Sequence, residues 1–314
     1  MEMIWLLLGF IIILIASNVL VDASSSIALK LRVPKMLVAL TIVAFGTCAP
    51  EVAISFQSIE ASNGQMAFAN VIGSCIVNVF LILGLASCIR PIKVRHTTIK
   101  KELPILLIVT TGFVILMVDS LFNPLTKNTF SRADALILLL LFCFFVLYLV
   151  QLFVKGKKKE EVKPKYSFWI AILLLILSLV FISFSSDIIV KNAEIIATNM
   201  GISQKVITMI LIVIGTSLPE LFMTVTSAFK GEFDLAIGNI IGTNIFNICI
   251  VLGLPILFYG DIVLNGFGFI DILFVFLSSF FLFLFARTEK TLSQKEGIFM
   301  ILCFILYYAT LFFL

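Results

Sequence analysis

Two glutamates stand in the sequence without an obvious positive partner. Glu51 lies well inside an apolar segment at 36–59, and Glu220 lies well inside another at 204–229. An ionised carboxyl group inside a membrane costs several kcal/mol, even on the most lenient scales. No Lys or Arg lies in the central part of any apolar segment, so an internal counter-charge is missing. We therefore expect the two carboxylates to bind cations that come from solution.

A proline precedes each of these glutamates. Pro50 and Pro219 each remove one helical hydrogen bond and clash with the carbonyl group four residues earlier, which belongs to Gly46 and Gly215. Free carbonyl groups survive at membrane depth only where protein, water or ions satisfy them. The sequence therefore predicts broken helices whose backbone oxygens also face a bound ion.

Hydroxyl and amide side chains accompany the glutamates at helical spacing. Residues four apart share one face of a helix, and four such pairs lie in apolar segments: Thr47 with Glu51, Thr216 with Glu220, Ser74 with Asn78, and Thr243 with Asn247. Single polar residues of this kind also join membrane helices to one another, but their symmetric recurrence favours a binding site.

The ligand atoms narrow the choice of ion. Every side chain of the cluster except Cys48 offers oxygen, which suits hard cations, whereas thiolate and imidazole suit zinc, copper or iron. Calcium accepts about 6–8 oxygens in flexible geometry, while magnesium demands a near-ideal octahedron. Two carboxylates formally neutralise one calcium ion, and the same oxygens can instead hold several sodium ions. Competition between the two loadings is a physical basis for exchange.

Composition places the elements that carry these residues in a membrane. The 314 residues are 61% apolar and 13% charged, with a mean hydropathy of +1.20, whereas soluble proteins carry about 25% charged residues. A spanning helix needs roughly 20 mainly apolar residues. Ten segments of this kind are expected near 3–21, 36–59, 66–89, 103–119, 133–154, 167–190, 204–229, 235–259, 267–286 and 296–314.

The chain also repeats itself. The segment 46–51 (GTCAPE) recurs at 215–220 (GTSLPE), an offset of 215 − 46 = 169 residues. The same offset pairs Asn70 with Asn239 and Gly73 with Gly242, and it pairs Asn78 with Asn247. Each repeat holds five predicted spans, an odd number, so the second copy enters the membrane from the opposite side. The predicted fold is an all-α integral membrane protein of ten transmembrane helices, arranged as two inverted-topology five-helix repeats at 1–154 and 167–314, with a basic cytoplasmic linker at 155–166.

Charge predicts the orientation of this fold. With the N-terminus outside, most of the 22 Lys and Arg residues fall in cytoplasmic segments, as the positive-inside rule requires. We therefore expect a multi-pass protein of the plasma membrane with both termini extracellular or periplasmic. The lone histidine, His96, is expected at the surface, and Glu102 and Asp271 are expected at solvated helix ends.

At the repeated segments the sequence resembles the sodium/calcium exchanger family, within the cation/calcium antiporters. The resemblance is carried by 46–51 and 215–220, together with 69–78 (ANVIGSCIVN) and 238–247 (GNIIGTNIFN). It implies alternating access, in which sodium entry drives calcium extrusion and the first and sixth helices slide across the other eight. The short linker implies an unregulated, prokaryote-like member.

The resemblance also implies roles for individual residues. Glu51 and Glu220 would bind calcium and sodium in turn, and Asn78 and Asn247 would flank the central site. Further oxygen ligands would come from Thr47 and Thr216, from Ser217, Ser74 and Thr243 at sodium sites, and from the backbone carbonyls of Ala44 and Val213. Two positions depart from the usual motif: Cys48 replaces a hydroxyl with a thiol, a poor sodium ligand, and Asn247 replaces the aspartate of some relatives, which argues against a potassium requirement.

Three other functions are considered. A calcium/proton antiporter would use the same two glutamates, because desolvation favours the protonated form of a carboxyl group. A passive cation channel would be lined by the same residues, but inverted repeats argue against it. An intramembrane enzyme is not expected, since a metalloprotease would need histidine ligands and the chain has one histidine. We expect calcium, sodium and the lipid bilayer as partners, with no nucleic acid and no cofactor, while the sequence identifies no protein partner.

Overall fold

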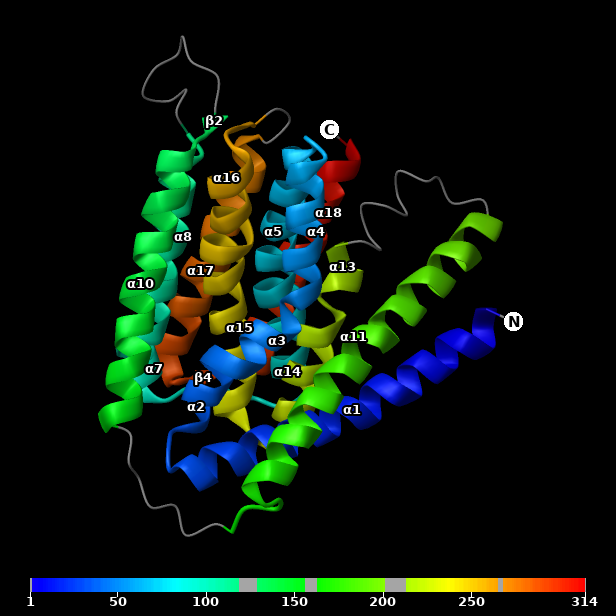
Figure 1. Ribbon diagram of the computed structural model, residues 1–314, viewed down its shortest axis with the longest axis vertical. Coiled ribbons are helices and arrows are strands. Elements are labelled where there is room, and N and C mark those ends of the chain that lie inside the picture. The colour runs from blue at the N-terminus through cyan, green and yellow to red at the C-terminus, as the bar shows by residue number, and fades with distance from the viewer. Residues whose placement is uncertain (1, 119–128, 156–162, 201–212, 265–267, 314) are drawn as a thin grey trace.

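The computed structural model describes residues 2–118, 129–155, 163–200, 213–264 and 268–313. This part of the chain is almost entirely helical, as predicted. Most helices stand side by side in one bundle, whereas α1 (Glu2–Leu31) and α11 (Phe168–Asn199) pack against each other and run obliquely across it (Figure 1).

The remaining elements follow in chain order. They are α2 (Lys35–Val38), η1 (Ala39–Val43), α3 (Ala44–Thr47), α4 (Ala49–Glu60), α5 (Gly64–Ile76), η2 (Val77–Leu83), α6 (Gly84–Ile89), β1 (Ile92–Lys93), α7 (His96–Lys100), α8 (Glu102–Leu116), β2 (Thr129–Phe130), α10 (Arg132–Lys155), α13 (Val213–Thr216), α14 (Leu218–Lys230), α15 (Phe233–Phe246), η4 (Asn247–Leu252), α16 (Gly253–Tyr259), β3 (Ile262–Val263), α17 (Phe269–Glu289), β4 (Thr291–Leu292) and α18 (Gln294–Phe313). The elements written η are π-helical turns.

Six helices of the described residues are long and apolar enough to cross a membrane, and a seventh span is gained if one bent pair counts as a single span. The six are α1, α5–η2–α6, α10, α11, α15–η4–α16 and α17, and the bent pair joins 35–47 to 49–60 at an angle of 47°. The other predicted spans correspond to α8, which has 15 residues, to α18 and to α14. The first part of the span predicted at 204–229 lies outside the described residues. Most of the linker predicted at 155–166 also lies outside them.

The two halves of the sequence contain similar elements at similar distances along the chain. A break at Cys48 precedes α4, and a break at Ser217 precedes α14. A π-helical turn follows α5 and another follows α15. Thr110 and Ser279, which are 169 residues apart, share a hydrogen bond of 2.9 Å between buried hydroxyl groups.

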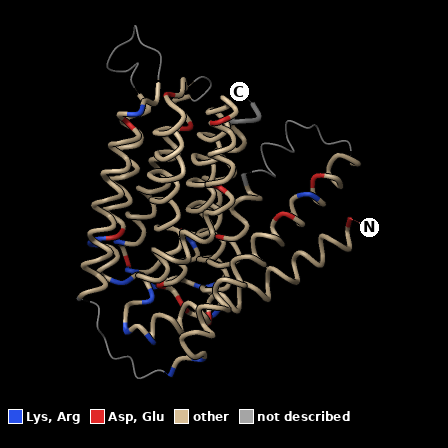
Figure 2. Tube along the Cα trace, viewed as in Figure 1, with Lys and Arg blue, Asp and Glu red and all other residues tan. Residues whose placement is uncertain are grey.

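The short strands connect the halves. Strand β1 pairs with β4, and β2 pairs with β3, each time antiparallel. Each pair therefore takes one strand from either half of the sequence, and the two pairs lie at opposite ends of the bundle (Figure 1). Lys and Arg gather near the end that holds α7 and β4 (Figure 2).

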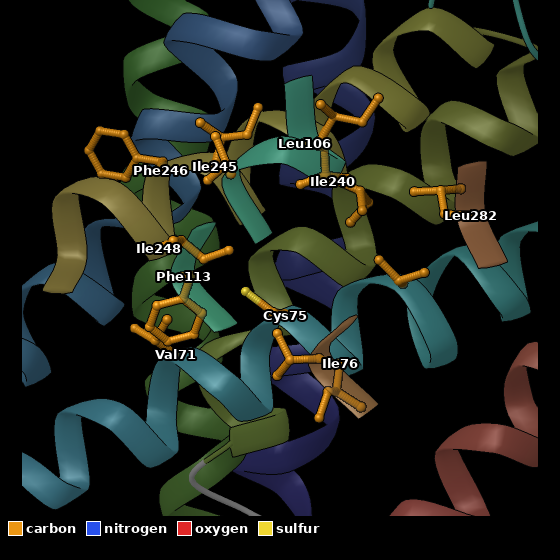
Figure 3. Close-up of a cluster of buried hydrophobic side chains, with 14 of the residues drawn as sticks. Val71, Cys75, Ile76, Leu106, Phe113, Ile240, Ile245, Phe246, Ile248 and Leu282 are labelled. Carbon is orange, nitrogen blue, oxygen red and sulfur yellow. The ribbon is translucent and has the colours of Figure 1, made fainter. Parts of the chain in front are cut away.

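The helices differ strongly in burial. The most apolar stretches of α5–η2–α6 and α15–η4–α16 are 78% and 83% buried, against 17% for α10. Val71 and Cys75 of α5 meet Ile240 and Ile245 of α15 and Phe113 of α8 in the apolar core (Figure 3). Any site carried by α5 and α15 is therefore enclosed by protein and shielded from lipid.

One expectation about charged residues is wrong. Glu102 and Asp271 are not solvated but buried, with exposed fractions of 2% and 9%. Glu102 accepts a hydrogen bond from Tyr148, and Asp271 accepts one of 2.9 Å from Tyr307. A tyrosine of the neighbouring helix thus replaces water at the start of α8 and of α17, which stabilises a buried carboxyl group.

Candidate cation-binding site

Two helix breaks position the glutamates. The chain leaves helical geometry at Cys48, where ψ is 0°, and at Ser217, where ψ is 5°. Pro50 and Pro219 then lie in the first turn of the new helices α4 and α14, where a missing N–H group costs nothing. The predicted breaks are confirmed at both positions, just before the prolines. Each glutamate lies in the first turn of its helix, and the positive end of the helix dipole stabilises a carboxylate there.

The carboxylates of Glu51 and Glu220 are fully buried. None of their four oxygens has a hydrogen-bond partner in the described part of the chain, and the two groups are close enough to repel each other. No Lys or Arg is buried among the described residues. A pair of acidic groups without donors or counter-charges is expensive in a protein interior, and a cation between them removes that cost.

Buried amide and hydroxyl groups lie on the two central helices, with Ser74 on α5, Asn78 on η2, Thr243 on α15 and Asn247 on η4. Ser74, Asn78, Thr243 and Asn247 are all 0% exposed. Within the described part of the chain, their polar atoms without a hydrogen-bond partner are Oδ1 of Asn78, Oγ1 of Thr243, and both Oδ1 and Nδ2 of Asn247. Asn247 opens the π-helical turn η4, and Asn78 is the second residue of η2. Such turns often mark functional positions in helices, and both begin at or one residue before one of these buried amides.

The helix breaks are tied to the central helices by symmetric contacts. Ser217 donates a hydrogen bond to the hydroxyl oxygen of Ser74 at 3.5 Å. The equivalent contact of the other half joins the thiol of Cys48 to the carbonyl oxygen of Thr243 at 4.0 Å. The thiol therefore occupies the place of a hydroxyl, and each break rests on α5 or α15.

Several threonine hydroxyl and backbone carbonyl groups at the helix breaks already form hydrogen bonds within the protein. Thr47 is close enough to Glu220 to interact with its carboxylate, but its hydroxyl donates to the carbonyl oxygen of Ala44 at 3.3 Å. The same oxygen of Ala44 accepts a hydrogen bond of 3.1 Å from the backbone N–H of Cys48. Thr216 donates to Oδ1 of Asn70 at 3.3 Å. Val213 is the first residue of α13, and the preceding residues 201–212 lie outside the described chain.

A very close approach of α15 to the first half holds this arrangement together. A Cβ atom added at Gly242 would lie 2.8 Å from Cβ of Ala44 and 2.9 Å from Cα of Leu40. One at Gly238 would lie 2.7 Å from Cβ of Ala39. Small residues four apart let the backbones of membrane helices come this close. The glycines therefore fix the distance between Thr243 and the break at Cys48.

Three further buried amides were not predicted as site residues: the sequence marked Asn70 and Asn239 only as a repeat pair, and it did not single out Asn244. Asn70, Asn239 and Asn244 are at most 2% exposed. The 169-residue offset relates Asn70 to Asn239, and that signal was available from the sequence. Asn244 corresponds to Cys75 under the same offset, so symmetry gave no hint of its role.

Asn244 orients Asn78. Its Nδ2 donates to the carbonyl oxygen of Cys75 at 3.4 Å, and its Oδ1 accepts from Nδ2 of Asn78 at 2.9 Å. A backbone carbonyl only accepts hydrogen bonds, so this contact determines the orientation of both amides. Oδ1 of Asn78 is left without a partner among the residues that the structure describes and is available to a cation.

We expect Asn244→Leu to weaken calcium binding. Loss of one hydrogen bond of about 1 kcal/mol would raise the calcium concentration for half-maximal transport roughly fivefold. The measurement is the calcium dependence of transport in proteoliposomes. Asn18→Leu is the control, because the side-chain amide of Asn18 is exposed and donates to the backbone of Leu14 in its own helix. An unchanged calcium dependence in Asn244→Leu would show that the hydrogen bond from Asn78 to Asn244 is not needed to orient the Asn78 amide for calcium binding.

The donor set suits a hard cation. It combines two carboxylates with amide, hydroxyl and carbonyl oxygens, and no group of three or more His, Cys, Asp or Glu occurs among the described residues. Oxygen donors of mixed type match calcium and sodium better than zinc or copper. A site with only two fixed negative charges can bind either one divalent ion or several monovalent ions.

Comparisons with known proteins agree with this geometry. The model of the sodium/calcium exchanger protein family matches residues 1–151 and 170–313. The chain is 37% identical over 262 residues to the putative antiporter CaxA of Alkalimonas amylolytica, covering 80% of this chain and 78% of that protein. It is 29% identical to the sodium/calcium exchanger MaX1 of Methanosarcina acetivorans, with 98% of each chain covered. The solved structure of the sodium-calcium exchanger NCX_Mj, soaked with 10 mM Na⁺ and zero Ca²⁺, superposes with a TM-score of 0.84 at 28% identity, over 99% of this chain and 98% of the other.

Proposed function

Because the chain belongs to the sodium/calcium exchanger protein family, as the sequence predicted, we propose that it exchanges calcium for sodium across the membrane by alternating access. The observation that carries this proposal is the pair of buried glutamates at two helix breaks, with four carboxylate oxygens that have no partner among the described residues. The proposed ion ligands are the twelve residues that the sequence predicted: Glu51, Glu220, Thr47, Thr216, Ser217, Ser74, Thr243, Asn78, Asn247, Ala44, Val213 and Cys48. The exchanger and antiporter names of its relatives support a transporter rather than an enzyme.

Exchange follows from exclusive loading of one site. Calcium between Glu51 and Glu220 would be neutralised by the two carboxylates and completed by the amide oxygen of Asn78 and by hydroxyl or carbonyl oxygens. Sodium ions would use the same carboxylates together with Ser74 and Ser217 or with Thr243. Since each loading removes ligands that the other needs, the ions bind in turn.

We also propose the full topology: ten spans in two inverted five-helix repeats, at 1–154 and 167–314, with the linker 155–166 on the cytoplasmic side. The recurring breaks, the π-helical turns and the two cross-paired strand pairs support it. Both termini would face outward across the plasma membrane, because Lys and Arg gather at the opposite end of the bundle from β2 and β3 (Figures 1 and 2).

Alternating access would use the oblique helix pair α1 and α11. These helices pack mainly on each other, which suits movement as one unit. Asp22 of α1 forms ion pairs with Lys165, just before α11, at 2.6 Å and with Lys230, at the end of α14, at 2.5 Å. The first pair would travel with the helices, while the second would break when they slide.

The test is calcium uptake into sodium-loaded proteoliposomes at clamped pH. Uptake of radiolabelled calcium should require the outward sodium gradient and should fall as external sodium is raised. Uptake that ignores sodium and follows a proton gradient would instead establish calcium/proton antiport through the same glutamates. If neither gradient moves calcium, the proposed substrate is wrong.

Replacement of the Cys48 thiol by a hydroxyl is expected to change the sodium affinity of the site. Cys48→Ser would restore the hydroxyl that Ser217 supplies in the other half, and oxygen is the harder ligand. We expect the sodium concentration for half-maximal effect to fall several-fold, with a smaller change in calcium dependence. Cys143→Ser serves as the control, because Cys143 is exposed. An unchanged sodium dependence would mean that residue 48 does not contact sodium.

A further inference from the structure

A basic pocket lies at one end of the bundle, away from the glutamates. It measures about 360 Å³ and is lined by His96, Ile99, Lys100, Pro104, Phe283, Arg287 and Lys290. The walls come from α7, from the first turn of α8, and from the end of α17 with the residue after it. Ligand pockets are typically about 300–1,000 Å³, so this one can hold a small polar group.

The charge of the pocket has a single sign. Lys100, Arg287 and Lys290 are exposed at its rim together with His96, and none of the four pairs with an acid in the described part of the chain. No acidic residue lines the pocket. Nearby basic residues behave differently, since Arg95 pairs with Asp234 and Lys35 with Glu232. The pocket therefore concentrates positive potential that its own walls leave uncompensated, which favours an anion.

The other wall of the pocket is apolar and is formed by Ile99, Pro104 and Phe283. Phe283 precedes Arg287 by one helical turn on α17, about 6 Å farther from the helix end. Pro104 and the buried Ile99 complete this wall. A free phosphate ion gains nothing from such a wall, whereas the glycerol and first methylene groups of a phospholipid do.

We propose that this pocket binds the phosphate headgroup of an anionic membrane lipid. Lys100, Arg287 and Lys290 hold the phosphate, and Phe283 packs against the start of the acyl chains. Basic pockets between spanning helices are suited to such headgroups. The lipid would join α7 to the end of α17, two elements from different halves of the sequence, at the same end of the bundle as the β1–β4 pair.

A fluorescence experiment tests this proposal. Phe283→Trp is introduced into a variant in which the two native tryptophans, the exposed Trp5 and Trp169, are replaced by phenylalanine. The protein is reconstituted in zwitterionic vesicles that contain a small fraction of brominated phosphatidylglycerol or of brominated phosphatidylcholine. Quenching by the anionic lipid should exceed quenching by the zwitterionic lipid. Each basic side chain adds a factor of about five to the association constant, so Lys100→Gln, Arg287→Gln and Lys290→Gln together should lower the preference at least tenfold.

The matched control removes the same number of charges from the same end of the bundle. Lys30→Gln, Arg32→Gln and Lys295→Gln change two lysines and one arginine that are exposed and outside the pocket. This control should keep the preference. Equal quenching by both lipids, or a preference that survives in the pocket variant, would overturn the proposal. Displacement of the lipid by an excess of inorganic phosphate would show a free-anion site instead, and a melting curve of each variant confirms that it is folded.

Discussion

Glu51→Gln and Glu220→Gln are each expected to abolish calcium–sodium exchange. Either change leaves the site with one carboxylate for a divalent ion. In the calcium-loaded site, each carboxylate and the calcium ion form a buried pair of opposite charges. Removal of one partner from such a pair costs about 3–5 kcal/mol, which lowers calcium affinity by at least about a hundredfold. Glutamine keeps the size of the side chain, so the loss would arise from charge rather than from packing. Uptake of radiolabelled calcium and calorimetric calcium binding both measure it.

Stability gives an independent readout of the same variants. The carboxylates of Glu51 and Glu220 are buried without hydrogen-bond donors among the described residues, so neutralising one of them removes an unfavourable buried charge. Without calcium, each variant should melt at or above the temperature of the parent protein. With calcium, the parent should gain stability through binding and the variants should not. Glu60→Gln on the same helix α4 is the control, because Glu60 is exposed. Retained exchange in either site variant would remove that glutamate from the proposed ligands.

The second large effect is expected at Gly242. Gly242→Ala places a methyl group 2.8 Å from Cβ of Ala44 and 2.9 Å from Cα of Leu40. Because Cα of Leu40 belongs to the backbone and cannot rotate away, α15 must move away from the segment that holds Leu40 and Ala44. Overpacking of this kind costs about 1–3 kcal/mol, and the shift moves Thr243, the next residue, relative to Cys48. We expect a lower melting temperature and a drop in calcium uptake of about tenfold or more.

Gly112→Ala is the matched control for this substitution. Gly112 also lies inside a helix, but the nearest atom to an added Cβ is the end of the Leu141 side chain at 3.3 Å, which can move. Because alanine favours helix by up to about 1 kcal/mol over glycine, Gly112→Ala should be neutral or slightly stabilising. If both substitutions have the same effect, the close approach at Gly242 does not hold the site together.

The sequence was informative where physical constraints act locally or recur. The prolines predict the breaks at Cys48 and Ser217, and the 169-residue offset relates Glu51 to Glu220. The first signal lies within a few residues of the break that it predicts, and the second is a fixed offset that recurs along the whole chain. The all-helical membrane fold follows from composition, because so many apolar residues have no other stable solvent.

Other features depend on contacts between distant residues. The tyrosines that bond to Glu102 and Asp271 lie 46 and 36 residues farther along the chain, so sequence position alone suggested solvated helix ends. Asn244 supports Asn78 although its equivalent under the offset is Cys75. The sequence analysis found no signal for the π-helical turns after α5 and α15. These parts required the three-dimensional arrangement.

The pairing of β1 with β4 and of β2 with β3 bears on how such a chain can arise. Each half offers one strand at either end of the bundle and receives the complementary strand from the other half. Two copies of a single ancestral half, inserted in opposite orientations, would make both strand pairs with each other. The contacts would then be isologous, as in a two-fold symmetric dimer. Gene fusion would preserve these contacts and free each copy to diverge, which is how one half could acquire Cys48 and Cys75 where the other holds Ser217 and Asn244.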